Sequence, residues 1–199
     1  MPRLSRAQSQ ARTRQQLVGT ARELFLRDGY ALTSLEKVAD AAGYSKGAVY
    51  SNFRNKDQLC LAVLDEIRTE QAGLMATAVA GEDGFEARLA AFQRWAEQNI
   101  GNEAWTSLEV EFALSARRDP AVREAIAGRD RAIRDGLAAL IKANAEQYGL
   151  SLPVSPGDAA TALLSLGIGL GVQRAIDPTI RVDVLTETIR LMAGRAVPE

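Results

Sequence analysis

Residues 33–59 constrain the fold of this chain more than any other segment, because they read as two short helices joined by a tight turn. Thr33 and Glu36 have the spacing of a capping box, in which each side chain accepts a hydrogen bond from a backbone N–H at the helix start. Gly43 gives the turn its backbone freedom, and Ser45 is a typical N-cap for the second helix. The first helix has one apolar stripe at helical spacing: Leu35, Val38, Ala39 and Ala42.

The second short helix is predicted to present its first turn to solvent, because its apolar anchors, Val49 and Phe53, come later. Its exposed start carries Lys46 and Gly47, with a hydroxyl at Tyr50. A short helix whose first turn carries small, basic and hydroxyl groups fits the major groove of DNA. The segment is therefore predicted to be a helix-turn-helix.

The same region resembles the N-terminal domain of the TetR family of bacterial transcriptional regulators, over about residues 12 to 60. One difference is Tyr44, which is bulkier than the small aliphatic residue expected in the turn. The resemblance implies a DNA-binding regulator. It is carried by Leu17, Ala21, Leu24, Phe25, Gly29-Tyr30, Thr33, Val38-Ala39, Ala42-Gly43, Ser45, Val49-Tyr50, Phe53, Lys56 and Leu59.

By resemblance and position, Lys46 and Gly47 face the groove floor, where lysine can donate to guanine and glycine lets the backbone come close. Thr33 and Lys56 lie at helix N-termini, which favour phosphate. Tyr50 could instead be a core aromatic, and both lysines could be solvated surface residues. The full expected DNA-contacting set is Thr33, Ser45, Lys46, Gly47, Tyr50, Ser51, Asn52 and Lys56.

Helical periodicity dominates the whole chain, and no stretch alternates like a half-buried strand, so the expected fold class is all-α. Three helices form a DNA-binding domain over residues 1–55, and six form a ligand-binding and dimerisation domain over residues 56–199, with the fourth helix joining the two. Proline at the first helical position marks two of the starts. The expected helices are 12–28, 34–41, 45–51, 56–79, 85–100, 103–117, 120–148, 156–177 and 182–195.

The net charge of −1 hides an asymmetry. Residues 1–60 contain ten Lys/Arg and five Asp/Glu, hence +5, and the remaining 139 contain fourteen and twenty, hence −6. A basic head suits a domain that meets phosphate, although a short basic segment can arise by chance.

The basic, polar N-terminus has no apolar core, so it does not read as a secretory signal, and a cytoplasmic protein is expected. This N-terminal segment could be an arm that lies along the DNA, or a tail without a role.

The chain has no histidine and one cysteine, Cys60, which excludes an intrachain disulfide. Flanked by leucines, Cys60 is expected to be a buried thiol. Without histidine or an acidic metal cluster, neither an enzyme nor a metal or cofactor site is predicted. The alternative function is a helical dimeric adaptor, or a regulator without small-molecule control.

Residues 159–172 form an uncharged, mostly apolar run of 14, too short to span a bilayer and typical of a buried helix, so no membrane association is expected. Its glycines at spacing four allow close helix packing. A nucleotide-binding loop is disfavoured because no strand precedes it. In the resembled family the last two helices pair with their copies, which implies a homodimer; an internal core helix is the alternative. The expected interface is Leu163, Gly167, Leu170, Gly171, Leu185 and Ile189.

The larger domain carries aromatic side chains that could line a cavity for a small-molecule effector, or could simply fill the core. Glu109 lies on an inward stripe, and a buried carboxylate wants a partner such as Arg174 or a cationic ligand. A repressor released from a palindromic operator in double-stranded DNA by a small, mainly apolar effector is the expected function. The expected effector residues are Met75, Phe92, Trp95, Trp105, Glu109, Phe112 and Arg174.

Overall fold

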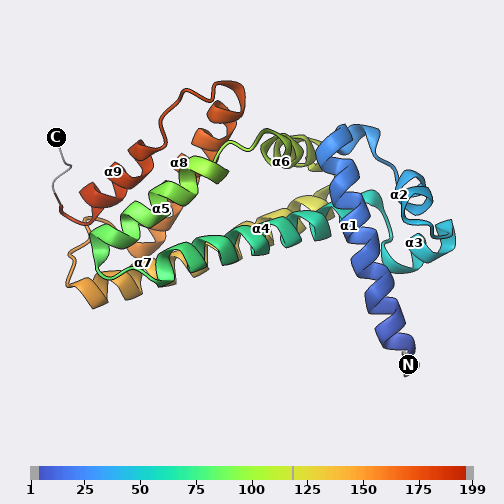
Figure 1. Cartoon of the computed structure of the whole chain (residues 1–199), viewed down its shortest axis with the longest axis horizontal. Helices are drawn as coiled ribbons and strands as arrows, with labels where there is room; N and C mark the ends of the chain where they lie inside the picture. Colours follow the sequence, from blue (N-terminus) through green and yellow to red (C-terminus); the bar gives the residue numbers. More distant parts are fainter. Residues whose placement is uncertain (1–4, 118, 196–199) are drawn as a thin grey trace. The chain divides into compact units, whose positions relative to one another are not determined.

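The computed structural model describes residues 5–117 and 119–195, and every regular element in those ranges is a helix (Figure 1). The all-α prediction is confirmed. The predicted helices are all found, and most boundaries agree within three residues. The observed elements are α1 Arg6–Leu32, α2 Leu35–Ala42, α3 Lys46–Asn52, α4 Lys56–Ala80, α5 Phe85–Asn99, α6 Glu103–Ala116, α7 Pro120–Tyr148, α8 Pro156–Ile176 and α9 Asp183–Met192.

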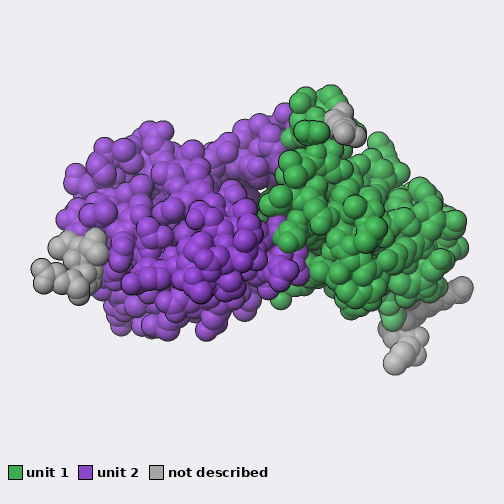
Figure 2. All heavy atoms as spheres, turned by 90° about the horizontal axis from the view of Figure 1, so that it is seen from above, with its two compact units in different colours: residues 1–70, 107–123 green, residues 71–106, 124–199 purple. Residues whose placement is uncertain are grey.

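The chain divides into two compact units (Figure 2). Unit 1 comprises residues 1–70 and 107–123, and unit 2 comprises residues 71–106 and 124–199. Helices α4, α6 and α7 each contribute residues to both units. The predicted domain boundary between residues 55 and 56 falls inside unit 1, because the first part of α4 and most of α6 pack with the helix-turn-helix.

The first helix begins earlier than predicted, at Arg6 instead of residue 12. Ser5 and Gln8 form a capping box at its start, with Ser5 N–H donating to the Gln8 side chain at 2.8 Å. The predicted N-terminal arm is therefore helical from Arg6 onward, and residues 1–4 lie outside the described residues. As the sequence predicted, regular helix stops at Gly29, where φ is +81°.

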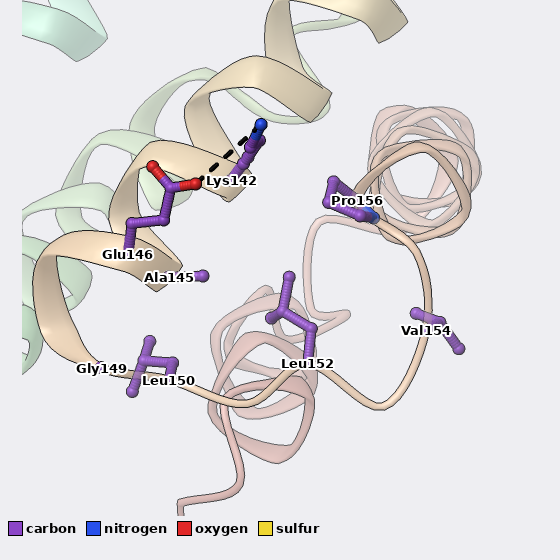
Figure 3. Close-up of a pocket in the computed structure, with 8 residues that line it drawn as sticks. All are labelled: Lys142, Ala145, Glu146, Gly149, Leu150, Leu152, Val154 and Pro156. Carbon is purple, nitrogen blue, oxygen red and sulfur yellow. Dashed lines mark ion pairs between the residues drawn. The ribbon is translucent and has the colours of Figure 1, made fainter.

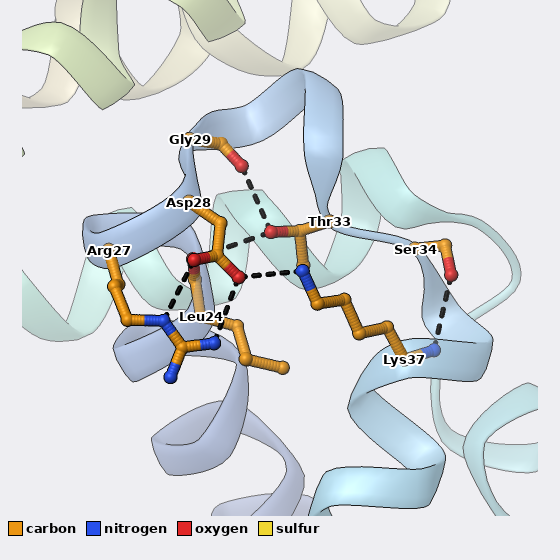
Figure 4. Close-up of polar contacts among 7 residues, drawn as sticks. All are labelled: Leu24, Arg27, Asp28, Gly29, Thr33, Ser34 and Lys37. Carbon is orange, nitrogen blue, oxygen red and sulfur yellow. Dashed lines mark hydrogen bonds and ion pairs between the residues drawn. The ribbon is translucent and has the colours of Figure 1, made fainter.

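The cap of α2 is Ser34, whose Oγ accepts from the N–H of Lys37 at 3.1 Å (Figure 4). The predicted capping box of Thr33 with Glu36 is wrong by one residue, because Thr33 turns into the core and is 1% exposed. The turn at Gly43 and the cap at Ser45 are confirmed, with φ +71° at Gly43 and Ser45 Oγ accepting from the N–H of Ala48 at 3.2 Å.

Unit 1 has one apolar core, built by α1, α2, α3, the start of α4 and most of α6. Helices α2 and α3 contact each other, and both contact α1. Burial raises the pKa of the Cys60 thiol, so Cys60 is the buried, neutral thiol that was expected. The largest fully buried side chains in this unit are Leu17, Phe25, Val38, Val49, Phe53, Leu59, Val63, Leu108 and Phe112.

In unit 2, α9 packs against α5 and α8. Leu170 of α8 and Leu185 of α9 are each 4% exposed and belong to this core. Among the described helices, α8 is the one that is long and apolar enough, by length and composition, to cross a membrane. Only 17% of its most apolar window is buried within the chain. Much of its apolar surface is therefore left uncovered by unit 2.

Candidate nucleic-acid interface

The first turn of α3 is exposed, as predicted for a recognition helix. Ser45, Lys46 and Gly47 are all exposed, while Val49 and Phe53 hold the helix to the core at 0% and 1% exposure. A Cβ at Gly47 would find its nearest neighbour, Ser45 Oγ, at 3.8 Å, which is ordinary contact. Packing therefore does not require glycine at position 47, and glycine weakens a helix by roughly 1 kcal/mol. A glycine here is consistent with the close approach of another backbone to the start of α3.

Tyr50 is 49% exposed, so the alternative of a core aromatic is wrong. Its hydroxyl donates to Glu36 Oε1 at 3.0 Å, and this bond helps to lower the pKa of Glu36 after the bond from its own backbone N–H. The other two predicted polar residues of α3 cap its end: Ser51 Oγ donates to Ala48 O at 2.9 Å and Asn52 Nδ2 donates to the same carbonyl at 2.8 Å. Their side chains already have partners within α3.

Thr33 does not offer a hydroxyl to DNA. Its Oγ1 donates to Gly29 O at 2.9 Å and to Leu24 O at 3.4 Å, which ties the start of α2 to the end of α1 (Figure 4). A side chain that is 1% exposed and already bonded to two carbonyls cannot reach a phosphate. The prediction for Thr33 is corrected to a structural role.

Lys56 is held by Tyr30 instead of pointing freely to solvent. Its Nζ donates to Tyr30 O at 2.9 Å and lies 4.1 Å from the centre of the Tyr30 ring. Lys56 lines a surface hollow of about 390 Å³ that also includes Ser34 and Tyr50. The N-terminus of α2, the side of α3 and the start of α4 therefore meet at one depression, whose lining is Ala31, Leu32, Thr33, Ser34, Leu35, Glu36, Tyr50, Arg54, Asn55 and Lys56.

The sequence analysis missed residues that orient α2 and α3. Arg14 places its guanidinium 4.2 Å from the centre of the Phe53 ring and donates to Asn52 O at 3.0 Å, so α1 caps the end of α3. Asp28 accepts from Lys37 Nζ at 2.7 Å, which links the end of α1 to α2 (Figure 4). In the sequence, Arg14 and Lys37 contributed only to the positive charge counted over residues 1–60.

Tyr30 joins three helices of unit 1. Its N–H donates to Glu111 Oε2 of α6 at 2.8 Å, and its hydroxyl donates to Asp57 Oδ1 of α4 at 2.5 Å. Its ring packs edge-on against Phe112 with 5.3 Å between centres. Burial, followed by the bond to Asp57, raises the pKa of Tyr30, so its hydroxyl stays protonated.

Two of the predicted effector residues belong to unit 1. Phe112 is 1% exposed and packs in the unit 1 core beside Tyr30. Glu109 accepts from Arg68 Nε at 3.0 Å. The predicted pairing of Glu109 with Arg174 is wrong, because Arg174 donates to the backbone carbonyls of Glu97, Ile100 and Ile180.

The other predicted effector residues, Met75, Phe92, Trp95, Trp105 and Arg174, belong to unit 2. Phe92 stacks on Trp95 with 5.8 Å between ring centres. A surface hollow of about 470 Å³ in the same unit is lined by other residues (Figure 3). The polar side chains at its edge, Lys142 and Glu146, face each other at 3.9 Å. Its lining is Lys142, Ala145, Glu146, Gly149, Leu150, Leu152, Val154 and Pro156.

The predicted dimer residues also need correction. Leu170, Gly171 and Leu185 are buried by their own chain, so they are not free to meet a second copy. The large apolar side chains that remain exposed on these two helices are Ile168 and Ile176 of α8, at 66% and 82%, and Val184 and Leu191 of α9, at 39% and 62%. Leu163, Gly167 and Ile189 are partly exposed.

Comparisons with known proteins match both parts of the chain. Residues 17–63 match the profile described as "Bacterial regulatory proteins, tetR family", and residues 85–197 match "BetI-type transcriptional repressor, C-terminal". Among curated relatives, the transcriptional repressor AcnR of Corynebacterium efficiens is 30% identical over 111 residues, covering 56% of this chain and 54% of that protein. A transcriptional repressor of Mycobacterium tuberculosis is 32% identical over 129 residues, covering 60% of this chain and 59% of that protein. The match thus spans about half the length of these relatives.

Solved structures share the fold at low sequence identity. A transcriptional regulator from a Rhodococcus species has a TM-score of 0.76 at 18% identity, covering 94% of this chain and 97% of that one. The reduced form of NemR from Escherichia coli has a TM-score of 0.71 at 20% identity, covering 90% and 96%. The second profile alone covers more than half of the residues, and the first lies on the helix-turn-helix. This chain belongs to the TetR family of bacterial transcriptional regulators, a family without enzymatic activity.

Proposed function

We propose that this protein is a homodimeric repressor that binds a palindromic operator through α3 and is released by a small, mainly apolar effector. The observation that carries the DNA-binding part is the first turn of α3, where Lys46 and Gly47 are exposed on a helix anchored by fully buried side chains. The curated relatives named above are themselves described as transcriptional repressors, which supports repression over activation.

Homodimer formation is supported by the uncovered apolar surface of the last two helices. Leu191 and Val184 are seven residues apart on α9, hence on one face, and Ile168 is exposed on α8. Helix α8 is apolar, but its own chain buries only a small part of it. If a second copy of the chain covered the exposed part, apolar surface would be removed from water and the dimer would be stabilised. A two-fold dimer would place two copies of α3 about 34–36 Å apart, for two half-sites of one operator.

Effector control would pass through the helices shared by both units. The sequence pointed to α4, and α6 is a second candidate, because Glu103–Thr106 belong to unit 2 while Glu111 and Phe112 contact Tyr30 in unit 1. An effector in unit 2 can lower operator affinity only if it binds more tightly to an arrangement that fits DNA less well. By linkage, the operator weakens effector binding by the same factor, typically ~5–150-fold.

The DNA-binding assignment can be tested by fluorescence anisotropy with operator duplexes and their single-base variants. Lys46→Ala should cost about 1–3 kcal/mol and relax the preference at one base position. The matched control is Lys142→Ala, an exposed lysine of unit 2 whose partner is a neighbouring glutamate on α7. If Lys46→Ala and Lys142→Ala bind every duplex as the unmodified protein does, α3 does not read the groove and the adaptor function is favoured.

A further inference from the structure

The first turns of α1 are not covered by the other helices of unit 1. Residues 6–12 are exposed and Thr13 is partly exposed, and Leu17 is the first residue of the helix to be fully buried. We call residues 6–13 the α1 arm; in Figure 1 it extends past α2 and α3. A helical segment this short is marginal on its own, yet a capping box of Ser5 and Gln8 specifies its start. The sequence therefore encodes a helical extension where no packing within the described part of unit 1 requires one.

Two contacts fix the place where the arm leaves the helix-turn-helix. Arg14 donates to Asn52 O at 3.0 Å, at the end of α3, and lies over the Phe53 ring. Two residues later, Gln16 Oε1 accepts from the hydroxyl of Tyr44, in the turn before α3. The arm therefore begins beside both ends of α3, the helix that we propose enters the major groove.

One face of α1 changes its chemistry where the arm begins. Leu17 is 0% exposed and belongs to the stripe through which α1 packs into the core. Positions 6, 10, 13 and 17 fall on one side of a helix, so Arg6, Gln10 and Thr13 continue that stripe into the arm. A stripe that turns from apolar to polar and basic is suited to a polar partner or to water, not to a protein core.

The charge of the arm fits a polyanion. The first acidic residue of the chain is Glu23, and Arg6 makes no hydrogen bond or ion pair with the residues that the structure describes. Arg6 lies eight residues before Arg14, hence about 12 Å farther along the helix axis. The major groove of DNA is also about 12 Å wide. Arg6 is therefore at the right distance to reach the phosphates that border a groove occupied by α3.

We propose that the α1 arm is a second DNA-binding surface, which lies as a rigid helix against the sugar-phosphate backbone beside the groove that α3 enters, with Arg6 in contact with phosphate. The arm adds affinity and not base recognition, because phosphate contacts carry no direct sequence information. This inference rests on the proposed binding of DNA through α3, to which it adds a separate contact.

The charge contact is tested by fluorescence anisotropy over a range of salt concentrations. The probes are a duplex that the unmodified protein selects from a random library and a scrambled duplex of the same length. Arg6→Gln should weaken binding to both duplexes about tenfold or more at roughly 50 mM salt, and should lower the slope of log affinity against log salt by about 1 per protomer. Arg123→Gln is the matched control, because it removes the same charge from an exposed arginine of α7 in unit 1. It should bind both duplexes as the unmodified protein does.

A pair of proline variants tests whether the arm acts as a rigid helix, since both keep every arginine. Ala11→Pro should interrupt the arm, because proline in a helix interior removes a backbone hydrogen bond and clashes with the preceding turn. Ala7→Pro is the control, because Ala7 lies in the first turn, where the backbone N–H has no helical partner. Ala11→Pro should therefore weaken binding as Arg6→Gln does, and Ala7→Pro should leave it unchanged. Thermal unfolding checks that the core is intact in all variants.

The proposal is overturned if Arg6→Gln and Arg123→Gln bind both duplexes equally well, which would make the arm a solvated extension without a role. It is also overturned if Ala11→Pro binds as tightly as Ala7→Pro, because the segment would then act as a flexible tail. A changed motif in library selection with Arg6→Gln would show that Arg6 reads bases and does not contact phosphate alone. If the unmodified protein binds neither duplex, the proposed function itself fails; if it binds and the arm variants bind equally, only this inference fails.

Discussion

The backbone N–H of Tyr30 donates to the Glu111 carboxylate at 2.8 Å, across 81 positions of the chain. The preceding residue, Gly29, has φ +81°, and a Cβ there would lie 3.1 Å from both Glu111 oxygens. The end of α1 is therefore shaped around a side chain from α6. This contact fixes the helix-turn-helix to α6 within unit 1. From the sequence, α4 alone was expected to join the DNA-binding domain to the rest of the chain.

We expect Gly29→Ala to lower the free energy of unfolding by about 1–3 kcal/mol, because a left-handed backbone strains a side chain and the new Cβ crowds Glu111. In a Glu111→Ala background the crowding is gone, so the same substitution should cost less. Denaturant unfolding of the four proteins measures this coupling. Equal costs in both backgrounds would show that Glu111 does not press on Gly29.

Glu111→Leu should itself destabilise the protein by about 1–3 kcal/mol, because the Tyr30 N–H loses its acceptor. Glu111→Gln retains an acceptor oxygen of the same shape and serves as the matched control. Chemical unfolding of both variants compares them directly. If Glu111→Gln lowers the free energy of unfolding as much as Glu111→Leu does, the negative charge matters and the hydrogen bond alone does not explain the contact.

Thr33→Val should reduce stability by about 1 kcal/mol, because the Gly29 and Leu24 carbonyls lose their donor. The salt dependence of DNA binding should stay unchanged, since the hydroxyl is buried. Thr77→Val, at an exposed threonine of α4, is the control for the loss of a hydroxyl. If Thr33→Val showed a flatter salt dependence of DNA binding, the phosphate contact predicted from the sequence would be supported instead.

Asp28 gives a prediction for pH. The hydrogen bond from Arg27, then the bond from Lys37, lowers the pKa of Asp28 in the folded chain. The stabilisation is therefore present above the unfolded pKa of about 3.9 and is lost as the pH falls toward the folded value. Thermal midpoints of the unmodified protein and Asp28→Asn should differ at neutral pH and converge in acid. An offset for Asp28→Asn that stays constant from neutral to acid pH would contradict the argument.

Leu191→Arg should convert the protein to monomers and weaken operator binding, because it puts a charge into the proposed two-fold contact of α9. Leu114→Arg is the matched control, since both leucines are 62% exposed. Light scattering reports the oligomeric state. A Leu191→Arg variant that stays dimeric would place the interface elsewhere.

Local patterns in the sequence predicted the helices well, because periodicity and caps such as Ser45 act over a few residues. They also predicted the exposed start of α3, where Val49 and Phe53 set the buried face. The contacts of Glu109, Arg174 and Lys56 were not predictable, since each partner comes from a distant segment and several would fit equally well. Thr33 was misassigned because Thr33 and Ser34 are both acceptable caps, and only the tertiary packing decides which one turns inward.

Leu170 and Leu185 show the same limit for the dimer surface. Helix α8 is apolar on most sides, so its sequence cannot tell which side meets its own core and which is left uncovered. The indole N–H groups of Trp95 and Trp105 have no hydrogen-bond partner among the described residues. This could not be predicted either, because a sequence records a donor but not whether it finds a partner.

The central claim, that α3 reads DNA as part of a two-fold dimer, is tested most directly by selecting bound duplexes from a random library and sequencing them. The account predicts a palindrome whose half-sites are about 10–10.5 base pairs apart, centre to centre, or a multiple of that spacing. Affinity for it should fall by about 10³–10⁵ between roughly 50 and 200 mM salt if 6–10 phosphates are contacted. An enriched pool without a shared motif, or with one unpaired half-site, would contradict the account.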